Sequence, residues 1–154
     1  MRILIFLFFL VNINSYSQTF AFEKERHLFN VSLISKNALN KVSKKRFEKE
    51  YEYEAKYLGK FKIKNREFYI INSSYVNLKS LHNDNQIFIY NSKRYFVGYY
   101  NLATNYQLPI KLVDNILFFK TEKCEEKVIL KNEIPKTICI GCENKKDCVE
   151  FQKP

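Results

Sequence analysis

Polar and apolar residues alternate with a period of two through the middle of the chain. From Tyr51 to Ile63 the odd-numbered positions are aromatic, aliphatic or glycine, and charged residues fill the even-numbered positions except at Leu58. Because successive side chains of a β-strand point to opposite faces, this pattern predicts a half-buried strand. The extended pattern resumes at Glu67–Ile71, so the two segments are expected to form a hairpin.

A two-residue loop at Asn65 and Arg66 would pair Ile63 with Phe68, and this register keeps apolar residues on one face. The same register pairs Phe61 with Ile70. A second hairpin is predicted from the strand 86–90, the polar turn 91–94 and the strand 95–100. The segment 80–85 between the two hairpins is expected to be a loop.

Shorter apolar runs follow the second hairpin at Ile116–Phe119, Val128–Leu130 and Thr137–Ile140. Each is short enough to predict one more strand, and Asp114 and Asn115 predict a turn before the first of them. The expected fold class is mainly β (α+β). It is an antiparallel β-meander, small barrel or sandwich, with one short N-terminal helix.

The position of that helix rests on residues 19–49. Phe29, Val31 and Leu33 alternate like a strand, with His27 in phase. Ser35 is then a candidate N-cap for a helix over residues 36–49. That helix would have the apolar residues Ala38, Leu39, Val42 and Phe47 on one face and the basic residues Lys41, Lys44, Lys45, Arg46 and Lys49 on another.

The first residues have the features of a secretory signal. Arg2 precedes the nine-residue apolar run Ile3–Val11, and Ser15-Tyr16-Ser17 places small residues before a cleavage site between Ser17 and Gln18. A membrane span needs about 20 apolar residues, and this run is less than half that length, so it predicts a cleaved signal and not an anchor. No membrane span is expected after cleavage. Removing residues 1–17 from the 154-residue chain leaves 137 residues, residues 18–154, which suit one small domain. The predicted localisation is secreted or periplasmic.

Four cysteines, Cys124, Cys139, Cys142 and Cys148, lie in the last third of the chain. An even number of cysteines in an exported chain predicts disulfides that staple the C-terminal segment 124–148, in one of three possible pairings. Two alternatives stay open. The four thiolates could hold zinc, or Cys139 and Cys142 could form a redox-active C-x-x-C pair.

The net charge is +10 at pH 7, with 26 Lys and Arg against 16 Asp and Glu. Such a surface attracts polyanions, so an acidic polysaccharide or cell surface is a possible partner. Nucleic acid is not favoured, because bidentate phosphate and base recognition relies on Arg, and the cationic residues here are almost all Lys.

Other chemistry has weaker support. His82 lies two residues from Asp84 in the expected loop, and Glu48, Glu50, Glu52 and Glu54 are carboxylates that could bind calcium or form cross-strand ion pairs. Asn30 and Asn72 begin glycosylation sequons. The chain has three glycines and lacks the sequence motifs of serine hydrolases, zinc proteases and nucleotide-binding loops, so no catalytic residue, metal or cofactor is predicted.

The tyrosines of the second hairpin are the best candidates for an exposed binding surface. In the expected register Tyr95 and Tyr99 share a face with Phe88, Tyr90 and Val97, and one member of the Tyr99-Tyr100 pair must point away from the buried face. The sequence therefore predicts a small, exported, non-enzymatic β-rich protein that binds or packs against an extracellular or envelope partner. The alternatives are a thiol–disulfide redox factor and a polyanion-binding module. The candidate binding residues are Tyr90, Tyr95, Tyr99 and Tyr100.

Overall fold

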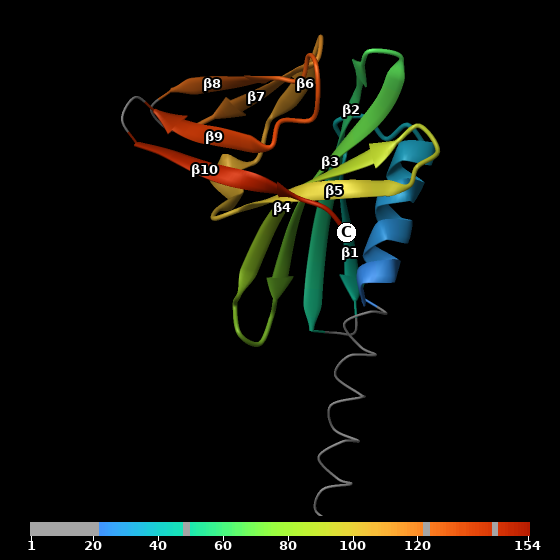
Figure 1. Cartoon of the computed structure of the whole chain (residues 1–154). Coiled ribbons are helices and arrows are strands. Elements are labelled where there is room, and N and C mark those ends of the chain that lie inside the picture. The colour runs from blue at the N-terminus through green and yellow to red at the C-terminus, as the bar shows by residue number, and fades with distance from the viewer. Residues whose placement is uncertain (1–21, 48–49, 122–123, 143–144) are drawn as a thin grey trace, which may run out of the picture.

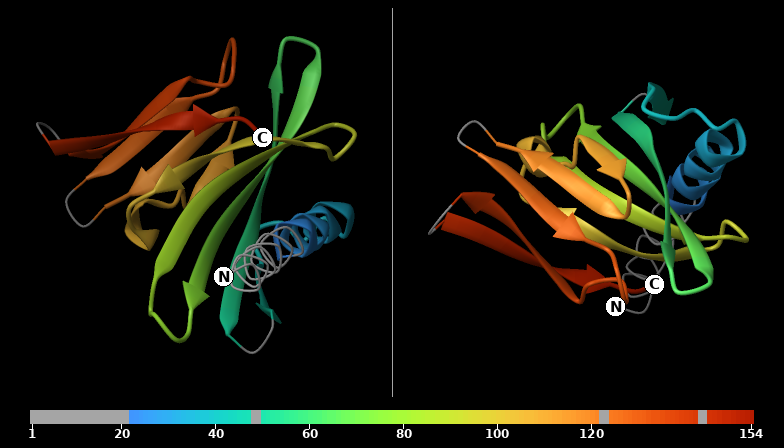
Figure 2. Two further views of the ribbon diagram at one scale, coloured as in Figure 1. Left: turned by 60° about the horizontal axis from the view of Figure 1, so that its bottom comes forward. Right: turned by 90° about the horizontal axis from the view of Figure 1, so that it is seen from above.

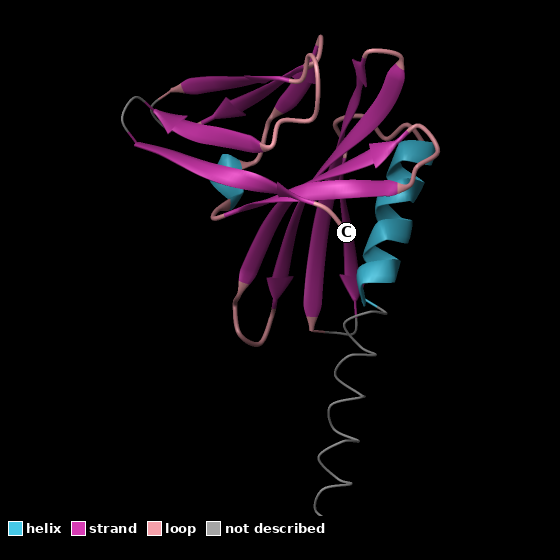
Figure 3. Ribbon diagram, viewed as in Figure 1, coloured by secondary structure: helices cyan, strands magenta, loops and turns pink. Residues whose placement is uncertain are grey.

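The computed structural model describes residues 22–47, 50–121, 124–142 and 145–154, which form one α-helix, one 3-10 helix and ten strands (Figure 3). All ladders between these strands are antiparallel. The predicted mainly β fold with one helix near the N-terminus is confirmed. The described strands do not close into a barrel.

The helix spans residues 22–35, and five strands follow it as a meander. Each of these strands pairs with the next one along the chain. Their bounds are Val42–Phe47 (β1), Tyr51–Ile63 (β2), Arg66–Asn77 (β3), Asn83–Asn91 (β4) and Phe96–Leu102 (β5).

The second half of the chain begins with the 3-10 helix Asn105–Gln107 and continues with five strands. The strands are Lys111–Val113 (β6), Ile116–Lys120 (β7), Glu125–Ile129 (β8), Thr137–Cys142 (β9) and Lys145–Gln152 (β10). β6, β7 and β8 form a separate sheet. β10 joins β9 to β5, so that the five-stranded meander and these two strands form one seven-stranded sheet in the order β1-β2-β3-β4-β5-β10-β9.

The helix and strands β6–β10 lie on opposite sides of the meander (Figure 1), as views from two further directions also show (Figure 2). The meander is therefore covered on both faces. One apolar cluster lies under the helix and includes Leu33, Ile34, Ile71 and Phe88. The other lies between the meander and the second half of the chain, and its members include Phe61, Ile87, Tyr100, Leu117, Phe119, Leu130, Ile138 and Ile140.

Strand β2 supplies residues to both clusters because a β-bulge interrupts it at Leu58. Tyr57 is opposite Ile71 and Gly59 is opposite Ile70, so Leu58 is an extra residue. Before the bulge the buried odd-numbered residues face the helix, and after it they face the second cluster. The single exception to the sequence alternation thus marks the point where the strand changes its buried face.

The predicted helix over residues 36–49 is wrong for residues 36–47, and residues 48 and 49 lie outside the described part of the chain. The helix ends where that one was expected to begin, with Asn37 in a left-handed conformation (φ 47°) and the Ala38 amide bonded to the Leu33 carbonyl at 3.0 Å. Residues 42–47 instead form β1, because cross-strand pairing with β2 brings Lys44 to Glu54 and Arg46 to Glu52.

The predicted strand around Phe29, Val31 and Leu33 is wrong for a related reason. In the helix, Arg26, Asn30 and Leu33 fall on one buried face with i, i+4, i+7 spacing. Two of these core positions are polar, so the apolar residues alone do not show the helical period. The alternation of Phe29, Val31 and Leu33 is coincidental.

The predicted hairpins are present, with changes in detail. The loop of the first is Lys64–Asn65, so Phe61 is opposite Phe68 and Ile63 is opposite Arg66. Both registers keep the same faces, so alternation could not distinguish them. The rings of Phe61 and Phe68 stack at 5.3 Å in the observed register. The expected loop over residues 80–85 is shorter, because β4 already begins at Asn83.

Candidate functional site

A groove lies between the helix and the turn that connects β4 to β5. It has a volume of about 420 Å³, within the range of small-molecule sites. We call it the helix–hairpin groove. The helix contributes Glu23, Lys24, His27, Leu28 and Val31, and the hairpin contributes Tyr90, Arg94, Tyr95 and Phe96.

The walls of the groove are largely apolar, and two large apolar side chains stand at its rim. Leu28 is 61% exposed and Tyr95 is 67% exposed, although burial of such side chains in a core would be favourable by about 1.5–3 kcal/mol each. Lys24 and Arg94 are also exposed. Within the described residues neither cation is in an ion pair, so both are available to an anionic group beside the apolar wall.

The buried guanidinium of Arg26, paired with the partly exposed Glu23 carboxylate, supports the helix side of the groove. Arg26 is 6% exposed; its Nη2 pairs with the Glu23 carboxylate and its Nη1 donates to Gln86 Oε1 at 2.8 Å. The guanidinium also lies over the Phe88 ring, 4.7 Å from the centroid. Because a buried charge is costly without partners, these contacts fix the helix at one position over β4.

A chain of hydrogen bonds connects the core to the floor of the groove. The Tyr53 hydroxyl donates to Asn30 Oδ1 at 2.8 Å, and Asn30 Nδ2 donates to the Tyr90 hydroxyl at 3.0 Å. The Tyr90 hydroxyl lies 2.8 Å from His27 Nδ1. Tyr53, Asn30 and Tyr90 are each at most 1% exposed, so the chain is shielded from water until it reaches His27.

Burial determines the protonation states of the side chains in this hydrogen-bond network. Desolvation, followed by the nearby Arg26 charge, lowers the pKa of His27 from 6.5 to about 4, so its imidazole is neutral at pH 7. Desolvation also raises the pKa of Tyr53 to about 12 and raises that of Tyr90 further. All the groups in this hydrogen-bond network are therefore neutral at pH 7, and none of them is a base with a pKa near 7.

Aromatic rings hold the His27 side chain in place. Its ring lies 4.3 Å from the Phe96 ring and 5.6 Å from the Phe88 ring, measured between centroids. Nε2 is 3.9 Å from the Glu23 carboxylate, which is beyond hydrogen-bond distance. The imidazole is thus positioned by its ring contacts with Phe96 and Phe88 and by Tyr90 at Nδ1.

The four tyrosines predicted as a binding surface do not lie on one exposed face. Tyr90 and Tyr100 are in the core, at 1% and 0% exposed, and the Tyr100 hydroxyl donates to the Pro135 carbonyl. Tyr99 is half-buried beside Phe96 and Phe88. Tyr90 and Tyr95 both line the helix–hairpin groove. The helix side of this groove was not predicted, because the pattern of residues 22–35 did not indicate a helix.

The prediction that the cysteines form disulfides is confirmed, with the pairs Cys124–Cys142 and Cys139–Cys148. The first joins the segment before β8 to the end of β9, and the second links β9 to β10 directly across the ladder. Cys139 and Cys142 therefore have different partners and do not form a C-x-x-C disulfide. No free thiolate remains for zinc.

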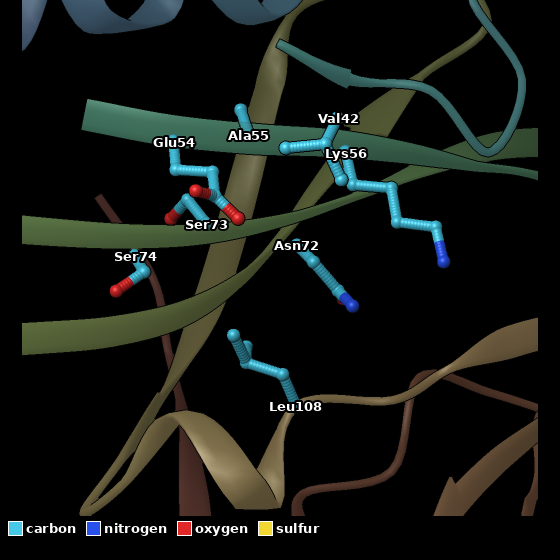
Figure 4. A pocket seen from close by; sticks show the side chains of 8 residues that line it. All are labelled: Val42, Glu54, Ala55, Lys56, Asn72, Ser73, Ser74 and Leu108. Carbon is cyan, nitrogen blue, oxygen red and sulfur yellow. The ribbon is translucent and has the colours of Figure 1, made fainter. Parts of the chain in front are cut away.

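A second, smaller pocket lies on the meander face opposite the helix. Its volume is about 90 Å³, and residues of β1–β3 line it on one side with Leu108 on the other (Figure 4). Asn72 is 5% exposed; its Nδ2 donates to the Pro109 carbonyl, and its Oδ1 has no partner among the described residues. The pocket has room for a few water molecules and is small for an organic ligand.

The remaining candidate groups that the structure describes are in ordinary surface contacts, and Glu48 lies outside the described residues. Glu52 and Glu54 form ion pairs with Arg46 and Lys44, as cross-strand pairing would predict. His82 Nε2 lies 3.2 Å from Asp84 Oδ1 at the surface. Among the described residues no three acidic, histidine or cysteine side chains cluster as a metal site would require.

The two glycosylation sequons are inaccessible in this fold. Asn30 is 0% exposed and bonded to two tyrosines, and Asn72 is buried in β3. Neither amide can receive a glycan while the protein is folded.

Comparison with protein-family models, with curated proteins and with solved structures finds no match to this chain. No helix among the described residues is long and apolar enough to cross a membrane.

Proposed function

We propose that this chain is an exported binding protein. It would hold a small molecule with an apolar body and an acidic head in the helix–hairpin groove. The observation that carries the proposal is the groove itself. A largely apolar cavity of about 420 Å³ has two exposed apolar side chains at its rim and two cations beside them.

Two features support the exported part of the proposal. Both disulfides would persist only in an oxidising compartment. The first 17 residues, which lie outside the described part of the chain, have the charged start, apolar run and small-residue cleavage site of a secretory signal.

The charges at the groove favour an acidic ligand. The carboxylate of Glu23 is already matched by the buried Arg26, which leaves Lys24 and Arg94 as the charges available at the rim. The net charge of +10 adds a long-range attraction for anions. A ligand with an apolar ring or chain and a carboxylate could contact the apolar wall and pair with these cations at the same time.

The two alternative functions receive less support. Redox chemistry through Cys139 and Cys142 would need these two residues to share one disulfide, and each is bonded elsewhere. A polyanion site would need a patch of available cations. Several basic side chains of the described surface are engaged by carboxylates, including Lys44, Lys45, Arg46, Lys60, Lys79 and Lys146.

The proposal is tested by titrating the purified, oxidised protein with 2-naphthoate, which combines an apolar double ring with a carboxylate. For a ligand of this size we expect a Kd on the order of 10–1000 µM. The Leu28→Glu variant should weaken binding at least tenfold, because it places a like charge on the apolar wall. Isothermal titration calorimetry measures both values.

The matched control is Leu81→Glu. Leu81 is 77% exposed in the turn between β3 and β4 and does not line the groove. The two variants have the same net charge, so any non-specific attraction of the anion changes equally. If Leu81→Glu weakened binding as much as Leu28→Glu, the groove would not be the site.

A further inference from the structure

We infer that His27 presents its Nε2–H group to the helix–hairpin groove as a fixed hydrogen-bond donor, which selects ligands with a carbonyl or carboxylate oxygen. The inference rests on the proposed function for the presence of a ligand. It goes further in naming the atom that recognises the ligand and the group that is recognised.

The direction of each hydrogen bond behind His27 follows from donor chemistry. An amide nitrogen can only donate, so Asn30 Nδ2 gives its proton to the Tyr90 oxygen. Asn30 Oδ1 can only accept, and it takes the proton of Tyr53. The Tyr90 oxygen therefore accepts from Asn30, and the proton of the Tyr90 hydroxyl still needs an acceptor.

His27 Nδ1, 2.8 Å from the Tyr90 oxygen, is that acceptor. The reverse arrangement, with Nδ1–H donating to Tyr90, would leave the Tyr90 proton without a partner at a site that is 1% exposed. A buried donor without a partner is costly. Nδ1 therefore carries no proton.

A neutral imidazole with an unprotonated Nδ1 must carry its proton on Nε2. The imidazole is neutral at pH 7, since burial holds its pKa near 4. Nε2 lies 3.9 Å from the Glu23 carboxylate, too far for a hydrogen bond, and that carboxylate is paired with Arg26. His27 lines the groove, so an oxygen of a bound ligand is the natural acceptor for Nε2–H.

The first measurement is the tautomer of His27, read from the ¹⁵N chemical shifts of its two ring nitrogens in the oxidised protein between pH 5.5 and 8. The inference expects a protonated Nε2 and an unprotonated Nδ1 throughout. In the Tyr90→Phe variant the fixed tautomer should give way to a mixture. An Nδ1–H tautomer in the unaltered protein would overturn the inference.

The second measurement compares three ligands that share one apolar body: 2-naphthoate, its uncharged methyl ester, and 2-naphthylmethylamine, which has no acceptor oxygen. The His27→Phe variant keeps the ring contacts and loses Nε2–H. This variant should bind both naphthoate and the ester about three- to tenfold more weakly. His27→Gln, which restores an N–H at a similar reach, should recover much of the loss. The amine should bind His27→Phe as it binds the unaltered protein.

An Arg94→Gln control separates the hydrogen bond from the charge. This variant should bind naphthoate more weakly and bind the ester with unchanged affinity, because the uncharged ester forms no ion pair with Arg94. If His27→Phe bound naphthoate and the ester as tightly as the unaltered protein, the inference would fail while the proposed function stood. If none of the three ligands shifted the NMR signals of the Leu28 and Val31 methyl groups, the proposed function would fail, and the assigned ligand class with it.

Discussion

His27 and Asn30 are polar residues at positions where a helix facing a sheet ordinarily places apolar ones. Asn30 is 0% exposed, and both ends of its amide are bonded to tyrosines of the sheet. Arg26, one turn earlier, is buried among Glu23, Gln86 and the Phe88 ring. Residues that break the local hydrophobic pattern are often found at functional sites, which agrees with the place of the groove beside them.

The lowered pKa of His27 predicts a pH dependence of stability. In the unfolded chain His27 titrates near 6.5 and in the folded protein near 4, so the unfolded state binds more protons between these values. The free energy of unfolding should therefore fall as the pH is lowered from about 6.5 towards 4. The slope from this residue is at most about 1.4 kcal/mol per pH unit, and residual exposure of the ring reduces it.

Urea denaturation at a series of pH values measures this slope. The matched variant is His27→Gln, which cannot titrate, and its stability should depend less on pH in this window. Both Arg26 and Glu23 face the imidazole, and they remain in the variant, so the difference between the two curves isolates His27. Parallel curves for the two proteins would contradict the assigned pKa.

Among the elements, the hairpins were predictable from the sequence and the helix was not. Alternation over residues 51–63 correctly predicts β2, because its side chains are sorted by face on either side of the Leu58 bulge. The helix at residues 22–35 escaped prediction because its buried stripe includes Arg26 and Asn30. The hairpin half of the groove, with Tyr90 and Tyr95, was therefore predictable, and the helix half required knowledge of which polar groups meet across the core.

Strand β10 was not predicted, because its sequence is mostly polar and its place depends on contacts distant in the chain. Cys148 is bonded to Cys139 on β9, and Phe151 pairs with Tyr100 on β5. The last two residues of β10 thus connect the second half of the chain to the meander. No local pattern specifies such a connection.

The Gly98→Ala substitution tests that connection. An added Cβ would lie 2.3 Å from the Gln152 backbone oxygen and 2.4 Å from the Phe151 ring, so the end of β10 would have to move. We expect a loss of about 1–3 kcal/mol in the free energy of unfolding. Faster hydrogen exchange is expected at the Phe151 amide, which bonds to the Lys136 carbonyl. Chemical denaturation and amide exchange measure the two effects.

Gly59→Ala is the control for backbone strain. Gly59 also has a positive φ, at 129°, but its Cβ would meet only side chains, Leu39 at 3.4 Å and Leu112 at 3.7 Å. Its substitution should cost stability without changing the exchange of Phe151. Equal exchange at Phe151 in both variants would contradict a specific role of Gly98 in seating β10.

In the whole molecule, the groove and the disulfides lie on different faces of the meander. The helix and the groove are on one face, and the disulfides are in strands β6–β10 on the other. Aromatic and aliphatic residues of β2–β5 contribute to both cores. The site should therefore depend on the disulfides only through global stability.

Replacing Cys124 and Cys142 by Ser tests this separation. Removing a bridge with a sequence separation of 18 should lower the free energy of unfolding by about 3 kcal/mol, because the unfolded chain gains freedom. At a temperature where the variant is still folded, its Kd for 2-naphthoate should stay within about twofold of the unaltered value. A tenfold weaker affinity in the folded variant would show that the bridge shapes the site.

Intermolecular nuclear Overhauser effects locate 2-naphthoate on the protein and so test whether the helix–hairpin groove binds the ligand. We expect contacts from the naphthyl protons to Leu28, Val31 and Phe96, which line the groove. A second cavity of about 420 Å³ among the described residues, with Ile63 and Ile134 in its lining, provides the comparison. Contacts to that cavity, with none to the groove, would show that the ligand does not bind in the groove.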